Sequence, residues 1–184
     1  QNPYIYTDRG IVFAAQKEFA KAIADFDKAL TLTNDEEQQD WIKSYVLMTR
    51  VALQSAEADK AAKNLDGLMG KSTGGTAAQR SQQFQTNFQA ARTQLKMLQD
   101  QVGLMARQYA EAEQLKLPDW YTSYANRSRR SLELMSEGFA LIDKLWTRTN
   151  TLLTVLPKLG DQLDKATSST TMSAGQLRPQ GSAA

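Results

Sequence analysis

The feature that most constrains the fold is an unbroken seam of apolar and small side chains between residues 84 and 112. Its members follow one another at alternating intervals of four and three residues: Phe84, Phe88, Ala91, Leu95, Leu98, Val102, Met105, Tyr109 and Ala112. In an α-helix this spacing brings every member to one side, where a second helix must cover them. The sequence therefore predicts a long helix that needs a long helical partner.

A second long helix is expected to return after a turn at Leu117-Pro118-Asp119, because proline disfavours helical geometry in the residue before it. It is expected to run to about residue 156, where Pro157 stops or kinks it before a last short helix at 158–166. Two apolar stripes follow this helix, one at Tyr121, Tyr124, Met135, Ile142, Leu145, Leu152 and Leu156, the other at Leu132, Phe139, Trp146 and Leu153. One stripe can pack on the seam helix and the other on the N-terminal helices or a partner subunit.

The N-terminal 36 residues carry aromatic and small side chains at intervals typical of two antiparallel helices, expected at about residues 4–15 and 18–32. The pattern consists of Tyr6, Gly10, Phe13, Phe19, Ala22, Phe26, Ala29 and Leu30. Its small members let two helices approach closely, while its aromatic rings fill the space between them. This pattern resembles one tetratricopeptide repeat (TPR) at residues 3–36. The resemblance implies a helix-turn-helix unit that binds other proteins rather than a catalytic domain.

Residues 37–69 are the candidate for a degenerate second repeat, or for another helical hairpin. Apolar side chains recur on one stripe at Trp41, Tyr45, Met48 and Ala52, but the small residues that a repeat needs are not at their expected positions. A single repeat cannot bury its own apolar face, so another part of the chain must cover it.

The TPR resemblance also implies a partner-binding face. Peptides bound by this family usually lie along the concave side of the first helices, which corresponds here to Tyr4, Thr7 and Ile11. The family's clamp for a C-terminal carboxylate has Lys and Asn where this chain has Thr7 and Ile11, so that chemistry is missing. The alternative is that these side chains pack inside one bundle.

A second candidate surface lies at the start of the returning helix, where Trp120, Tyr121 and Tyr124 are followed by Arg127. Aromatic side chains beside an arginine are typical of binding hot spots. The alternative, which the frequency of buried aromatic residues favours, is that these rings close the end of the bundle.

The segment at 70–76, Gly-Lys-Ser-Thr-Gly-Gly-Thr, is predicted to be a linker. Its Gly-Lys-Ser core is similar to a phosphate-binding loop, but Leu65 stands where that motif needs its first glycine, and a helix rather than a strand precedes it. A nucleotide-binding enzyme that uses Lys71 and Ser72 is therefore only a distant alternative. Residues 167–184 are rich in Ser, Thr and Gly and are expected to form a disordered tail.

The composition argues against most enzyme classes, because the 184 residues include no cysteine and no histidine. Thiolate nucleophiles, histidine relays and the commonest metal ligands are therefore absent. The carboxylates are scattered, so we expect no catalytic residues, no cofactor and no metal. Nucleic-acid binding is not expected either, because the net charge is only +2 and the one basic cluster, Arg127, Arg129 and Arg130, is spread around a helix. No apolar run reaches the length of a membrane span.

These patterns predict an all-α protein with a TPR-like region at 1–69, the linker at 70–76, a long antiparallel helical hairpin at 77–166, and the tail at 167–184. The expected function is that of a non-enzymatic adaptor that binds a protein partner with its helical faces. The alternative is a structural coiled-coil subunit of a larger extracytoplasmic complex, such as a secretion or conjugation apparatus. Such a subunit could form a homo-oligomer through the helix that carries the seam at residues 84–112. The chain begins with Gln1, which removal of a signal peptide would explain, so a periplasmic or secreted location is slightly favoured over a cytoplasmic one.

Overall fold

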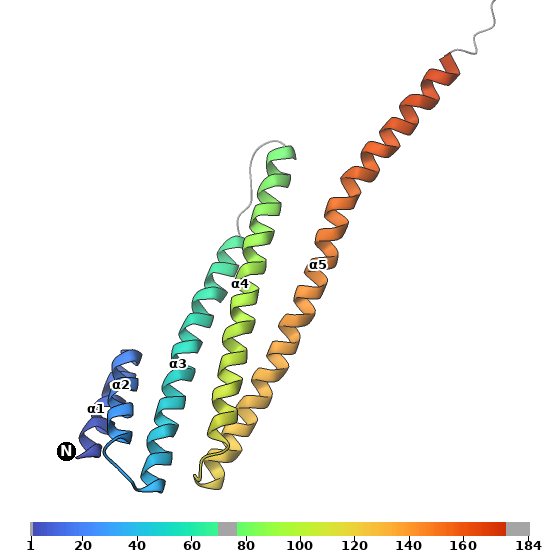
Figure 1. The fold of residues 1–184 in the computed structure, drawn as a ribbon. Coiled ribbons are helices and arrows are strands. Elements are labelled where there is room, and N and C mark those ends of the chain that lie inside the picture. Colours follow the sequence, from blue (N-terminus) through green and yellow to red (C-terminus); the bar gives the residue numbers. More distant parts are fainter. Residues whose placement is uncertain (1, 70–76, 176–184) are drawn as a thin grey trace, which may run out of the picture. The chain divides into compact units, whose positions relative to one another are not determined.

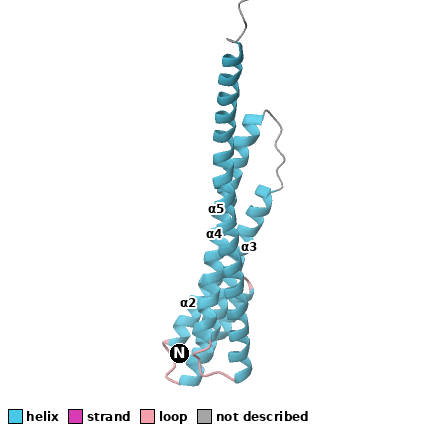
Figure 2. Ribbon diagram, turned by 90° about the vertical axis from the view of Figure 1, so that its right-hand side faces the viewer, coloured by secondary structure: helices cyan, strands magenta, loops and turns pink. Residues whose placement is uncertain are grey.

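The computed structural model describes residues 2–69 and 77–175, and this part of the chain contains helices and loops but no strand (Figures 1 and 2). The predicted all-α fold is therefore confirmed. The helices are α1 (Pro3–Ala15), α2 (Phe19–Leu30), α3 (Glu36–Met69), α4 (Ala77–Ala112) and α5 (Asp119–Gly175). Residues 1–141 form one compact unit and residues 142–184 a second, so α5 contributes to both.

Helices α1 and α2 form the expected N-terminal hairpin, with boundaries within two residues of those predicted. Asn2 caps α1 by accepting a hydrogen bond of 3.0 Å from the backbone N–H of Tyr4. The reversal occurs at Gln16 and Lys17, and Lys17 adopts a left-handed backbone conformation with φ of 63°. Such a residue just after a helix lets the chain turn back on itself.

The two helices of this hairpin meet at their small residues. Ala22 and Ala29 are fully buried and Gly10 is buried as well. A Cβ atom on Gly10 would lie 2.6 Å from Cε1 of Phe26, so any larger residue would have to displace this ring. Arg9 donates two hydrogen bonds, of 2.6 and 2.7 Å, to the carboxylate of Asp25, and they lower the pKa of Asp25. The close approach predicted from the sequence is therefore present.

Helix α3 continues the core of this hairpin, since Ile42 and Val46 are buried in one cluster with Ala22, Phe26 and Ala29. The helix begins after Asp35, whose Oδ1 accepts a 2.7 Å hydrogen bond from the backbone N–H of Gln38. It is a single helix of 34 residues, so the helical hairpin considered for residues 37–69 is not formed. The reason is local, because residues 41–66 contain neither glycine nor proline and are rich in strong helix formers.

The seam of α4 packs against α3, and the two helices lie side by side (Figure 1). The seam is buried from its third member onward: Ala91, Leu95, Leu98, Val102, Met105, Tyr109 and Ala112. Phe84, at its beginning, is 52% exposed and instead stacks on Phe88. The long partner that the seam requires is therefore supplied within the chain by α3.

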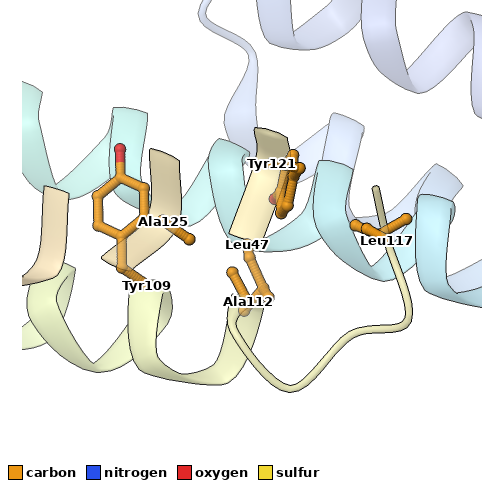
Figure 3. Packing of buried hydrophobic residues seen from close by; sticks show 6 residues of the cluster. All are labelled: Leu47, Tyr109, Ala112, Leu117, Tyr121 and Ala125. Carbon is orange, nitrogen blue, oxygen red and sulfur yellow. The ribbon is translucent and has the colours of Figure 1, made fainter. Parts of the chain in front are cut away.

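The turn between α4 and α5 closes on α3 through a second buried cluster, which Figure 3 shows: Leu47, Tyr109, Ala112, Leu117, Tyr121 and Ala125. Outside this cluster, Nε of Arg129 on α5 donates a 2.6 Å hydrogen bond to Oε1 of Glu113, just after α4. The predicted reversal at Pro118 is thus confirmed, and the start of α5 packs beside the end of α4.

The predicted end of the returning helix at about residue 156 is wrong, because α5 continues through Pro157 to Gly175. An interior proline removes one backbone hydrogen bond and can be accommodated without ending a helix. The tail expected from residue 167 is thus helical as far as Gly175, whereas residues 176–184 and the linker at 70–76 lie outside the described residues. Within the described ranges, no helix combines the length and apolarity needed to cross a membrane.

Candidate functional site

A groove lies between α1 and the first turns of α3, with a volume of about 450 Å³. We call it the α1–α3 groove. Its lining residues come from these two helices and the residue before α3: Tyr4, Thr7, Asp8, Ile11, Asp35, Glu37, Gln38, Trp41, Ile42 and Tyr45. The three N-terminal residues that the TPR resemblance places on a partner-binding face are thus brought together in one concave site.

The α1 wall of the groove offers two apolar side chains to solvent. Tyr4 is 62% exposed and Ile11 is 39% exposed, and their spacing of seven residues puts them on one side of the helix. Thr7 lies between them but is buried, and its Oγ1 donates a 3.1 Å hydrogen bond to the carbonyl oxygen of Pro3. Thr7 therefore shapes the wall while its hydroxyl is occupied within α1.

The α3 wall carries two aromatic rings, and each of them contacts a ring from another helix. The ring of Tyr45 stacks on Phe26 at 5.7 Å between centroids, and Trp41 meets the ring of Tyr121 edge-on at 6.4 Å. Ile42, 1% exposed, is the most deeply buried of the lining residues on this helix. These contacts restrain the two aromatic side chains. The sequence places Trp41 and Tyr45 on one stripe but gives no sign that this stripe faces Tyr4 and Ile11.

All charged residues of the lining are acidic. Asp8 stands on α1, Asp35 and Glu37 stand at the start of α3, and all three are exposed. Arg9, the neighbour of Asp8, instead faces α2, where it binds Asp25. The α1–α3 groove therefore combines large apolar and aromatic side chains with negative charge on both walls.

The fold buries one residue of the second candidate surface and leaves the other three exposed. Tyr121 is 6% exposed and belongs to the buried cluster at the α4–α5 turn, as the bundle-closing alternative expects for this ring. Trp120 is 63% exposed and meets the ring of Tyr121 edge-on, while Tyr124 is partly exposed and its Oη lies 3.3 Å from Oη of Tyr109. Arg127 is exposed. Only Trp120, Tyr124 and Arg127 remain accessible to a partner.

A smaller cavity of about 260 Å³ lies where α2, α3 and the end of α4 meet. Its charged lining residues are of both signs, with Asp27 and Glu111 beside Lys43 and Arg50. This mixture sets no preference for one charge in a ligand, in contrast to the α1–α3 groove.

Within residues 2–69 and 77–175, no three Asp or Glu side chains come together in a way that could hold a metal ion. Lys71 and Ser72, the residues of the nucleotide-binding alternative, lie outside the described residues.

Comparison of the chain with protein-family models, with curated proteins and with solved structures found no match. The TPR resemblance of residues 3–36 therefore stays a prediction from sequence.

Proposed function

We propose that this protein is a non-enzymatic adaptor that binds a segment of a partner protein in the α1–α3 groove. The observation that carries the proposal is the pairing of exposed Tyr4 and Ile11 on one wall with Trp41 and Tyr45 on the other. Large apolar side chains around a concave site are typical of binding surfaces.

The support for this groove over other surfaces is its preorganisation. Phe26 holds Tyr45, and Tyr121 holds Trp41, so these rings lose little conformational freedom when a partner binds. Aromatic rings also contribute a large contact area for few rotatable bonds.

A photo-crosslinking experiment tests the proposal in cells that produce the protein. A photoreactive phenylalanine analogue is placed at Ile11 in the groove, or at Val12, its 53%-exposed neighbour on α1, which does not line the groove. We expect a discrete crosslinked partner from position 11 only, and its loss when Tyr4→Glu is added. Equal crosslinking from both positions, or none from position 11, contradicts the proposal.

A second candidate function, a structural assembly subunit, is favoured by a separate observation in the second unit. Five large apolar side chains of α5 are between 38 and 60% exposed: Ile142, Leu145, Leu152, Val155 and Leu159. Leu145, Leu152 and Leu159 follow at intervals of seven, the spacing of a coiled-coil seam. Association with another helix would bury this stripe, whereas the α4 seam is already buried within the chain.

Sedimentation velocity tests whether the protein is such an assembly subunit. If the α5 stripe mediates assembly, the wild-type chain is an oligomer that Leu152→Glu dissociates. Thr151→Glu is the matched control, because Thr151 is exposed and adjacent but lies off the seam. A monomeric wild type, or equal effects of both substitutions, contradicts an assembly role for this stripe.

A further inference from the structure

We propose that the segment bound in the α1–α3 groove is cationic, with lysine or arginine beside a large apolar anchor. This inference rests on the adaptor function proposed above and adds the chemistry of the ligand. Its basis is charge complementarity, because Asp8, Asp35 and Glu37 line the groove and no lysine or arginine does.

The carboxylates around the groove fall into two groups. Three nearby carboxylates that do not line the groove have cationic partners within the chain: Asp25 binds Arg9, Asp40 binds Lys43, and Glu36 binds Lys116. Within the described residues, by contrast, no lysine or arginine forms an ion pair with Asp8, Asp35 or Glu37. Three carboxylates without a lysine or arginine counterion therefore line this groove.

The positions of these acids match those of the apolar contacts. Asp8 lies one helical turn after Tyr4 and three residues before Ile11, so the carboxylate lies between two apolar contacts on α1. Glu37 lies one turn before Trp41 on the facing wall. A bound segment can therefore place an apolar side chain against the rings while its cationic side chains reach carboxylates on both sides. The faces of Tyr4, Trp41 and Tyr45 also attract lysine and arginine through cation–π contacts.

The same charges disfavour other occupants. Acidic peptide ends, phosphorylated segments and nucleic acid would bring like charge against the three carboxylates. In a second copy of this chain, Arg129 of the basic cluster on α5 is already bound to Glu113 and Glu133, which leaves Arg127 and Arg130. We assign the groove to a segment of a different protein, and binding of a second copy is an outcome that the test separates.

The test uses the full-length chain and a displayed library of random twelve-residue peptides as the probe. Peptides are selected on the wild type after removal of those that bind a Tyr4→Ser variant. We expect the retained sequences to be enriched in lysine or arginine next to leucine or an aromatic residue. Binding of one such peptide is then measured by fluorescence anisotropy at several salt concentrations.

Two substitutions remove groove charge without changing side-chain size, Asp8→Asn and Glu37→Gln. Each is expected to weaken binding about 1.5- to 5-fold, the range of an exposed ion pair, and the loss is expected to shrink at high salt. Glu57→Gln, an exposed position on the same helix outside the groove, is the matched control and should leave binding unchanged. Asp35 is left intact because it caps α3.

The outcomes separate this inference from the adaptor function. Neutral or acidic peptides that still depend on Tyr4 would overturn the cationic ligand and leave the groove as a binding site. Basic peptides that bind the Asp8→Asn/Glu37→Gln variant as well as the wild type would also overturn it. A library without any Tyr4-dependent binder would remove the adaptor proposal itself. Self-association that is lost in the Tyr4→Ser variant would instead assign the groove to a second copy.

Discussion

The backbone N–H of Lys116 donates a 2.9 Å hydrogen bond to Oδ2 of Asp40, across 76 positions of sequence. Asp40 is buried, and its other oxygen accepts a 3.0 Å bond from Nζ of Lys43. The contact attaches the α4–α5 turn to the first turns of α3. Trp41, the next residue after Asp40, lines the α1–α3 groove, so this hydrogen bond lies beside one wall of the groove.

The first prediction concerns acid stability. Burial alone would raise the pKa of Asp40, but the hydrogen bonds from Lys116 and Lys43 outweigh it and lower the pKa below its ordinary value. The carboxylate therefore stabilises the fold fully above its unfolded-state pKa, near 4, and this contribution is lost as the pH falls through the lower folded-state value.

We expect Asp40→Asn to lower the free energy of unfolding at neutral pH by about 1–3 kcal/mol, because a buried charged acceptor is lost. Urea denaturation of both proteins between neutral pH and about pH 2.5 measures this. The two stabilities should converge as the pH falls, and a constant difference across the range would show that the Asp40 charge contributes nothing.

The second prediction concerns the close contact of α1 and α2. Gly10→Ala places a methyl group 2.6 Å from Cε1 of Phe26 and should destabilise the protein by about 1–3 kcal/mol. Gly103→Ala is the matched control, because a Cβ there meets nothing within 4 Å and alanine favours a helix by up to about 1 kcal/mol. Thermal unfolding should move in opposite directions for the two variants. A Gly10→Ala protein as stable as wild type would mean that the hairpin is more open at this point.

The third prediction separates intrachain packing from oligomerisation on α4. Leu98 is 8% exposed, so Leu98→Glu should cost more than about 3 kcal/mol of folding stability, with or without self-association. The neighbouring Met97 is 44% exposed, and Met97→Glu should change stability by less than about 0.5 kcal/mol. Denaturation paired with light scattering checks both. A stable but dissociated Leu98→Glu protein would mean that the seam joins different chains.

The fourth prediction concerns alkaline pH. Burial, and to a smaller extent the hydrogen bond with Tyr124, raises the pKa of Tyr109 to about 12. A group with a raised pKa stabilises the fold below its unfolded-state value, near 10, and this contribution is lost as the pH rises toward 12. Absorbance titration of the phenolate should therefore show a late step that Tyr109→Phe removes. A loss of absorbance change near pH 10 in Tyr109→Phe, in place of the late step, would indicate that this hydroxyl reaches solvent freely.

The parts of the fold that could be predicted from sequence depend on contacts close along the chain. Gly10, Ala22 and Phe26 define the α1–α2 hairpin because their spacing alone specifies how two adjacent helices pack. The turn at Pro118 is likewise local. Residues 37–69 were harder, since the apolar pattern of two short helices differs little from that of one long helix, and only the lack of a breaking residue separates them.

The parts that could not be predicted depend on which helices become neighbours. The α4 seam requires a partner, but its spacing does not say that the partner is α3 rather than a second chain. The same limit applies to the groove, where Tyr4 and Ile11 follow from the TPR resemblance, but Trp41 and Tyr45 join them only once α3 lies beside α1. The bond between Asp40 and Lys116 joins positions too far apart for any local pattern to indicate.

The double contact of Trp41 gives the protein an optical reporter at its own candidate site. The indole lines the groove and also touches Tyr121, so its emission reports both occupancy and the state of the α4–α5 turn. The sequence has three tryptophans, and replacing Trp120 and Trp146 with phenylalanine leaves Trp41 as the only tryptophan. A change in its intensity or wavelength on adding a ligand would then reveal binding without a label.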